Sequence, residues 1–444
     1  MIKFFAVLIL CMVLTATADA ATLDKATKTF LNKEFSAQIG EADTKVLGLG
    51  VIVFKDGAEV YSKFAGRSHV APNKKMTRQT LFRAASLSKM FTIFSVMQLV
   101  EQGKIDLNAD ISDYLGFELR NPNFPNAPIT IEMLASHTSS LRDGEIYSLP
   151  PQYSLEEFFT ADGVAYEDGA HFSDKPNEAP GKYFQYSNLN YGILGTIIER
   201  VTGERFDLYQ QNHILKQLGI SGGYVVGNLS KKDFKNLGAI YQNIGGKWTA
   251  QIDDYKTQPQ KNFIDVQNPY APDAFGTCDV SNYQIGTNAT IFAPQGGLRI
   301  SFDDLSKSLQ MLMNGGTYDG KQIISRESFD EMISSRWVFD EDNPNGNTYG
   351  SVMENYGLGL YKIGGSSRAR LCRDYEIDLI GHSGEAFGLI SGLYFLPETR
   401  DGVIFMINGT ACEVGDELSF GDFGANYIWE ENIMNPICQK IFAR

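Results

Sequence analysis

The sequence contains few residues that commonly bind metals, with only five cysteines and five histidines among 444 residues. The cysteines form no C-x-x-C pair, which disfavours thiol redox chemistry and a zinc ribbon. The histidines form neither H-x-H nor H-E-x-x-H, which disfavours a zinc hydrolase. The nucleotide-binding patterns G-x-x-x-x-G-K-[ST] and G-x-G-x-x-G are absent as well. We therefore expect a protein that uses no metal and no organic cofactor.

Positive charge is also scarce. The chain has 39 lysines and arginines against 53 aspartates and glutamates, which gives a net charge of −14. A nucleic-acid-binding protein normally presents a basic face, so we expect no nucleic-acid partner. The same deficit argues against adhesion to an anionic membrane.

Long apolar runs are missing after the first twenty residues. Within residues 1–20, Lys3 precedes an apolar stretch over residues 4–14, and Ala18-Asp19-Ala20 forms an A-x-A cleavage site. This pattern predicts a signal peptide over residues 1–20, cleaved before Ala21. The alternative is an N-terminal membrane anchor, but the run is about half of the ~20 residues that a membrane span requires. We expect an exported protein, periplasmic or secreted, with no stable membrane anchor.

Export to an oxidising compartment permits disulfides. Four cysteines follow the predicted cleavage site: Cys278, Cys372, Cys412 and Cys438. They allow up to two disulfides with three possible pairings, and buried free thiols are an equally good interpretation.

The order of elements predicts one sheet built from both ends of the chain. Strand patterns and a longer helix pattern on each side surround a middle region of short helices and long polar loops. Strands are predicted at residues 46–54, 59–65, 356–363, 377–382, 388–396 and 402–408, and longer helices at 86–103 and 422–442. We predict a sheet domain from residues 21–105 and 350–444, with a mostly helical insert at 106–349. The binding site is expected in the cleft between them.

The segment Gly381-His382-Ser383-Gly384-Glu385 nearly matches the G-x-S-x-G nucleophile elbow. Its fifth residue is glutamate, where the sharp turn favours a small residue. In an α/β-hydrolase the catalytic histidine follows the serine, and no histidine follows His382. We therefore reject Ser383 as the nucleophile.

A better nucleophile is Ser86, which with Lys89 forms the S-x-x-K pattern of this sequence. Residues three apart share one face of a helix, so the lysine amine can reach the serine hydroxyl. A desolvated lysine can lose its proton near neutral pH and then accept the proton of the serine. The alternative is a helix-capping serine followed by a solvated lysine.

Two further patterns complete a constellation in chain order. Tyr186-Ser187-Asn188 offers a phenol that can relay protons and an amide that can hold a carbonyl. His382-Ser383-Gly384 is predicted at the end of a strand, where a backbone N–H can stabilise a developing oxyanion. A second Y-x-N triplet at Tyr241-Gln242-Asn243 shows that this pattern is weak alone.

The ordered set resembles the serine β-lactamase and penicillin-binding protein superfamily, in its class C-like branch with D,D-peptidases, D-aminopeptidases and family VIII-type esterases. The resemblance extends from about residue 45 to 408. Four more phrases resemble the family: residues 133–141 (MLASHTSSL), 186–192 (YSNLNYG), 296–299 (GGLR) and 381–384 (GHSG). It implies an α/β (α+β) fold of the β-lactamase/transpeptidase type and an acyl-enzyme mechanism. Ser86 would be the acylated nucleophile, and Lys89 and Tyr186 would share the role of general base.

The resemblance also implies binding residues. Asn188 would orient the substrate amide or carbonyl, and the N–H groups of Ser86 and Glu385 would form the oxyanion hole beside Gly384. His382 stands where the family usually has the lysine of Lys-Thr-Gly.

Two departures from the family bear on the substrate. A histidine at position 382 is mostly neutral at pH 7, and Glu385 adds a negative charge, so both weaken the binding of anionic ligands. We therefore expect a hydrolase of small esters, amides or D-amino-acid peptides, and peptidoglycan is one source of such peptides. The alternatives are a penicillin-binding or wall-fragment-sensing protein with little turnover, and a class C-like β-lactamase.

Overall fold

The computed structural model describes residues 22–268, 271–364, 368–422 and 426–443. The predicted signal peptide over residues 1–20 lies outside these ranges, so it stays a prediction. Within them, no helix is long and apolar enough to cross a membrane.

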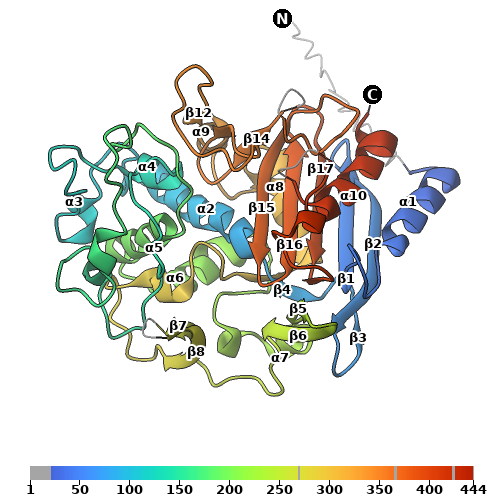
Figure 1. Ribbon diagram of the computed structural model, residues 1–444, viewed down its shortest axis with the longest axis horizontal. Helices are drawn as coiled ribbons and strands as arrows, with labels where there is room; N and C mark the ends of the chain where they lie inside the picture. The colour runs from blue at the N-terminus through green and yellow to red at the C-terminus, as the bar shows by residue number, and fades with distance from the viewer. Residues whose placement is uncertain (1–21, 269–270, 365–367, 423–425, 444) are drawn as a thin grey trace, which may run out of the picture.

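A nine-stranded sheet lies in the right-hand half of the molecule as drawn in Figure 1, in the order β12-β13-β14-β15-β16-β17-β1-β2-β3. Its N-terminal strands are β1 (Gly48–Lys55), β2 (Ala58–His69) and β3 (Lys74–Lys75). Its C-terminal strands are β12 (Trp337–Val338), β13 (Asn355–Tyr356), β14 (Tyr361–Ile363), β15 (Leu379–Ala386), β16 (Leu389–Leu396) and β17 (Asp401–Ile407). All pairs are antiparallel, and β1 lies between β2 and β17. The predicted sheet from both ends of the chain is therefore confirmed.

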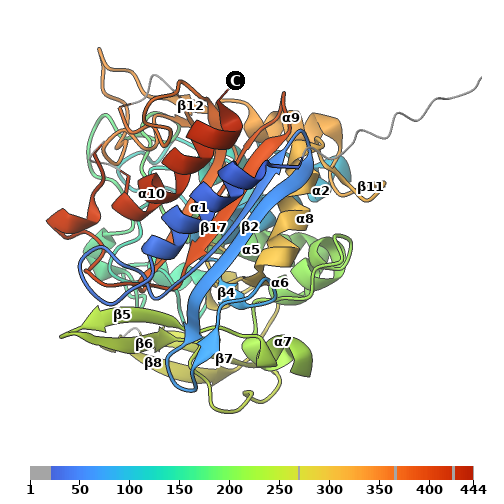
Figure 2. The ribbon, with the colours of Figure 1, turned by 90° about the vertical axis from the view of Figure 1, so that its right-hand side faces the viewer.

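The two faces of the sheet are covered by different helices. Successive side chains of a strand point to opposite faces. In β1, Val51 and Val53 pack in one core with helices α1 (Lys25–Ala37) and α10 (Ile428–Ile437). The alternate residues Ile52 and Phe54 pack in a second core with helix α8 (Phe302–Met313). Figure 2 shows α1 and α10 side by side over the first face.

The second core continues into the helical part of the chain. Helix α2 (Ser88–Glu101) is almost wholly buried there against helix α5 (Leu189–Thr202). Shorter helices contact this pair: α3 (Ser112–Leu115), α4 (Ile131–Ala135), α6 (Phe206–Tyr209) and α9 (Arg326–Ile333). Helix α7 (Lys231–Lys235) belongs to a separate small core. Helix α8 and strand β12 also fall within residues 106–349 yet contact the sheet, so the boundaries of an insert remain a prediction.

The structure corrects the sequence analysis in the middle region and near the N-terminus. The middle region was expected to contain only short helices and long polar loops, but it also contains strands. β5 (Ile240–Ile244), β6 (Lys247–Ile252), β7 (Phe263–Asn268) and β8 (Ala271–Asp279) pair as two hairpins. Helix α1 was not predicted, although Asp24 caps its N-terminus. These strands are short and interrupted by polar residues, so they lack the apolar runs that favour strand prediction.

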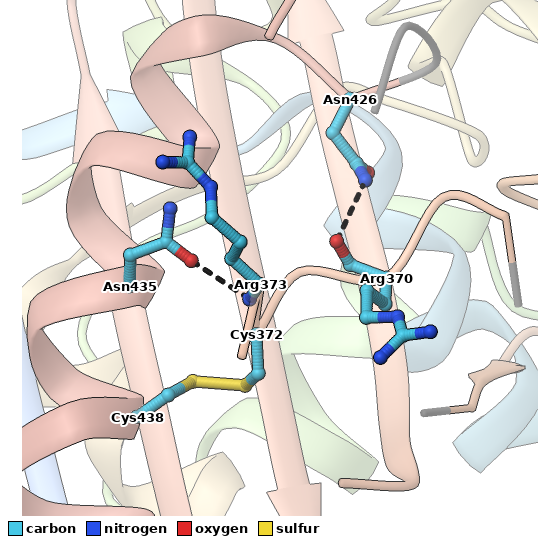
Figure 3. Close-up of a disulfide and its surroundings, with 6 residues drawn as sticks. All are labelled: Arg370, Cys372, Arg373, Asn426, Asn435 and Cys438. Carbon is cyan, nitrogen blue, oxygen red and sulfur yellow. Dashed lines mark hydrogen bonds between the residues drawn. A yellow bond between two sulfur atoms is a disulfide. The ribbon is translucent and has the colours of Figure 1, made fainter. Parts of the chain in front are cut away.

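One disulfide links Cys372 to Cys438, immediately after α10 (Figure 3). Cys412 is not part of a disulfide. Nearby hydrogen bonds fasten the same segments: Asn435 Oδ1 accepts from the Arg373 N–H at 2.9 Å, and Asn426 donates to the carbonyls of Ala369 and Arg370. The disulfide therefore ties a connecting segment to the C-terminal helix.

Candidate active site

Ser86 lies in a short 3-10 turn, Ala85–Leu87, that leads directly into α2. The turn follows strand β4 (Leu81–Arg83), which pairs with β9 (Arg299–Ser301). Ala85 and Leu87 are buried on either side of Ser86, and Ala85 has a positive φ of 49°. Ser88 braces the turn, because its hydroxyl donates to Ala85 O at 2.7 Å and accepts from the Leu298 N–H at 3.1 Å. Ser86 is therefore held at the start of α2 with its side chain partly exposed.

Lys89 lies one helical turn after Ser86 and has no exposed surface. Its Nζ lies 3.2 Å from Ser86 Oγ, 2.8 Å from Asn188 Oδ1 and 3.2 Å from Gln295 O. Burial lowers the pKa of Lys89 to about 7, although the charge of Asp143 acts in the opposite direction. A neutral amine has two hydrogens and one lone pair. Asn188 Oδ1 and Gln295 O can only accept, so they take the two hydrogens of the amine. The lone pair is then left to accept the hydrogen of the Ser86 hydroxyl.

Asp143 fixes the orientation of Asn188. Its carboxylate accepts from Asn188 Nδ2 at 2.9 Å, from Ser187 Oγ at 2.8 Å and from the Leu189 N–H at 2.9 Å. Because the carboxylate requires a donor, the amide nitrogen faces Asp143 and the amide oxygen faces Lys89. The sequence analysis did not identify Asp143, since no sequence pattern connects this loop residue to a triplet more than forty positions later.

Tyr186 is packed among aromatic rings beside Lys89. The His137 ring lies 4.2 Å from the Tyr186 ring, and Lys89 Nζ lies 4.6 Å from the centre of the Tyr186 ring. Burial raises the pKa of Tyr186 well above its usual value, and a hydrogen bond with Ser86 only partly opposes the rise. His137 is neutral because burial and the neighbouring Lys89 hold its pKa well below the usual value. Tyr186 is thus a protonated phenol in contact with the serine.

His382 lies inside strand β15, not at the end of a strand as expected from the sequence. Its ring is 1% exposed, Nε2 lies 3.1 Å from the Tyr356 hydroxyl, and Nδ1 is hydrogen-bonded with Ser383 O. Burial and the nearby Lys89 lower the pKa of His382 to about 3. The imidazole is therefore neutral, and both of its nitrogens are already engaged within the protein.

Gly384 brings strand β15 against the turn that carries Ser86. A Cβ at this position would lie 2.8 Å from Ala84 O, 3.1 Å from the Ser86 backbone nitrogen and 2.4 Å from Ser391 Oγ. β14 pairs with β15 only at residues 379–381, so the other edge of residues 382–386 is not paired with that strand. This arrangement places β15 beside the Ser86 N–H, as an oxyanion hole made with Glu385 requires.

Glu385 is exposed and accepts a hydrogen bond from the Tyr427 hydroxyl at 2.6 Å. Glu430 lies near it on α10, where its carboxylate accepts from the Tyr427 N–H at 3.1 Å. Burial raises the pKa of Glu430 to about 7, and the charge of Glu385 contributes to the rise. Neither Tyr427 nor Glu430 was identified from the sequence.

A cavity of about 1000 Å³ brings these residues together. Its lining contains six of the seven predicted site residues: Ser86, Tyr186, Asn188, His382, Gly384 and Glu385. Lys89, the seventh, lies beneath Ser86. Among the described residues, no group of three or more His, Cys, Asp or Glu side chains is arranged to hold a metal ion. The arrangement has the groups needed for acyl transfer: a hydroxyl, an amine of lowered pKa, a phenol and backbone N–H groups.

Three known proteins illustrate the similarity. Protein flp of Staphylococcus aureus is 30% identical over 173 residues, covering 38% of this chain and 33% of that protein. N-acetylmuramyl-L-alanine amidase of Bacillus subtilis is 25% identical over 313 residues, covering 64% of this chain and 63% of that protein. The chain thus spans about a third of the first relative and less than two thirds of the second.

Among solved structures, D-amino acid amidase of Ochrobactrum anthropi SV3 superimposes with a TM-score of 0.61 and 21% identity, covering 94% of this chain and 99% of that one. At this identity the similarity shows the fold alone. The family model described as Beta-lactamase matches residues 27–418. The chain therefore belongs to the beta-lactamase family and has the β-lactamase/transpeptidase fold.

Proposed function

We propose that the protein is an exported hydrolase that acts through an acyl-enzyme at Ser86 on small esters, amides or D-amino-acid peptides. The observation that carries this proposal is the 3.2 Å separation of Lys89 Nζ from Ser86 Oγ, with the lysine wholly buried and its pKa lowered to about 7. A serine hydroxyl becomes a nucleophile only when an adjacent base takes its proton.

In the acylation step, neutral Lys89 accepts the Ser86 proton while Oγ attacks the substrate carbonyl carbon. The negative charge that develops on the carbonyl oxygen is stabilised by the N–H groups of Ser86 and Glu385. The charge of Asp143, held in place by its bonds to Asn188, stabilises the ammonium that forms on Lys89. We assign Asn188, which accepts from Lys89 and lines the cavity, to the binding of the acyl group.

Collapse of the tetrahedral intermediate breaks the bond to the leaving group. Tyr186 donates its phenol proton to the departing oxygen or nitrogen and regains one from Lys89, so the Ser86 proton ends on the leaving group. Because burial raises the pKa of Tyr186 well above its usual value, we assign it as the relay and Lys89 as the base. Water then attacks the acyl-enzyme through the same groups in reverse, releasing the acid.

Export is supported by the signal-peptide pattern of residues 1–20 and by the Cys372–Cys438 disulfide, since disulfides persist mainly in oxidising compartments. The substrate class is supported by the names of two similar proteins. The solved structure of similar fold is a D-amino acid amidase, and the second relative in sequence is an N-acetylmuramyl-L-alanine amidase. A peptidoglycan-derived peptide fits both names and an exported location.

The test is turnover by the purified mature chain and its Ser86→Ala variant on three substrate types: p-nitrophenyl esters, D-amino-acid p-nitroanilides and a chromogenic cephalosporin. Multiple turnovers of an ester or anilide that vanish in Ser86→Ala support the proposal. Stoichiometric acylation without turnover would favour a penicillin-binding or sensing protein. Cephalosporin hydrolysis as fast as the best ester would favour a β-lactamase, and turnover unchanged in Ser86→Ala would overturn all three.

A further inference from the structure

Arg83 is a charged residue of the cavity lining that the proposed chemistry does not use. It is the last residue of β4 and lies three positions before Ser86. Its side chain is only partly buried, so part of it faces the cavity. A guanidinium is always charged in proteins, so this position adds a fixed positive charge beside the nucleophile.

The guanidinium is held at one edge only. Arg83 Nε donates to Gly296 O at 3.0 Å, and Cζ lies 5.9 Å from the centre of the Phe387 ring. The two terminal nitrogens have no hydrogen-bond partner in the described part of the chain, and no carboxylate there lies within 4.0 Å of them. Burial is the main cause that lowers the pKa of Arg83 to about 10, and the nearby Arg299 adds to it.

The acidic groups around Arg83 form no ion pair with it in the described part of the chain. Asp253 is bound by Arg299 through two hydrogen bonds of 3.0 and 2.9 Å. Glu385 and Glu430, which also line the cavity, are both bonded to Tyr427. Glu145 lines the cavity as an exposed residue and forms no ion pair with Arg83 in the described structure. A partly desolvated cation that its own protein leaves unpaired is a ready partner for an anionic ligand.

We propose that Arg83 binds a carboxylate of the substrate, so that the enzyme prefers acids over their neutral amides. The two free nitrogens form a planar fork that matches the two oxygens of a carboxylate. His382, which is neutral and fully engaged, does not provide a positive charge at the third motif. Arg83 provides one beside Phe387, which directly follows β15, and next to the turn that carries Ser86. This inference rests on the proposed function and deepens it.

Two pairs of esters test the proposal. The first compares mono-p-nitrophenyl glutarate with p-nitrophenyl glutaramate, which differ only in a carboxylate or amide on the acyl group. The second compares the butyrate esters of 3-hydroxybenzoate and 3-hydroxybenzamide, which differ in the leaving group. The readout is the ratio of kcat/KM for the acid to that for the amide, in wild type, Arg83→Gln, Arg83→Lys and the surface control Arg326→Gln.

A charge-assisted hydrogen bond predicts that Arg83→Gln lowers this ratio about 10- to 100-fold for at least one pair, with a smaller loss in Arg83→Lys. Arg326, exposed and paired with Asp330, should leave the ratio at its wild-type value when changed to Gln. A purely structural effect of Arg83→Gln lowers both members of a pair together. An unchanged ratio for both pairs would overturn the inference, whereas no Ser86-dependent turnover of any of the four esters would overturn the proposed function itself.

Discussion

Lys89 Nζ lies 3.2 Å from Ser86 Oγ at a position where the lysine has no exposed surface. Placed on adjacent turns at the start of α2, the two residues meet through local geometry, whereas the burial of Lys89 depends on segments distant in the sequence. Gln295 O and Asn188 Oδ1 accept the hydrogens of the amine. These contacts convert a sequence pattern of low specificity into an amine that can act as a base near neutral pH.

The first prediction concerns pH. Lys89 must be neutral to accept a proton, and its pKa is lowered to about 7. For a neutral ester, kcat/KM should rise with pH through about 7 and fall about tenfold per pH unit below it. Glu430 has a pKa raised to about the same value, so Glu430→Gln is the necessary control. The fall of kcat/KM at acidic pH, the acidic limb of the profile, should persist in that variant. Its disappearance would assign the titration to Glu430.

The second prediction concerns Asp143, whose charge raises the pKa of Lys89 and whose carboxylate orients Asn188. Asp143→Asn removes the charge, so the pKa of Lys89 should fall and the acidic limb of kcat/KM should move to lower pH. The plateau should also fall, about tenfold or more, because Asn188 loses its fixed orientation. If the plateau of kcat/KM falls but the acidic limb stays at the same pH, Asp143 has only a structural role.

The third prediction concerns the contact between β15 and the Ser86 turn. Gly384→Ala places a Cβ 2.8 Å from Ala84 O and 3.1 Å from the Ser86 nitrogen, so one element must shift. Displacing an oxyanion-hole donor typically costs about 100- to 1000-fold in kcat. The matched control is Gly296→Ala in the same cavity, where the nearest atom would be 3.8 Å away. Equal activity of the two variants would contradict the placement of the oxyanion hole at this strand.

The fourth prediction concerns stability. The Cys372–Cys438 disulfide closes a loop with a sequence separation of 66 residues. Replacing both cysteines by serine should lower the free energy of unfolding by up to about 4 kcal/mol, because the unfolded chain regains the entropy of that loop. Urea denaturation of the double variant against Cys412→Ser measures the effect. A midpoint equal to that of Cys412→Ser would show that the disulfide contributes nothing.

The residues of the candidate site could be found from sequence to different extents. Ser86 and Lys89 could be identified from sequence because they lie close together along the chain. Tyr186 and Asn188 could be identified because they belong to a short motif before a helix. The family resemblance supplied the order that joined these motifs. Asp143 could not be identified, since its role depends on a loop folding back onto the start of α5.

His382 shows the limit of assigning a role from position alone. Its place in the third motif was predicted, but its environment was not, because Tyr356 and the neighbouring aromatic rings come from other strands. Similarly, the central strands were predicted from their apolar runs, whereas the hairpins of β5–β8 were not. Tertiary contacts decide these features, and a single sequence does not encode them in any local pattern.

The central claim is that Ser86 is a nucleophile activated by Lys89, and the most direct measurement is covalent labelling by a fluorophosphonate. Intact-mass spectrometry of wild type and Ser86→Ala, followed by peptide mapping, gives the number and position of adducts. We predict one adduct on wild type, located at Ser86, none on Ser86→Ala, and slower labelling of wild type as the pH falls below about 7. No adduct on wild type, or an equal adduct on the variant, would contradict this claim.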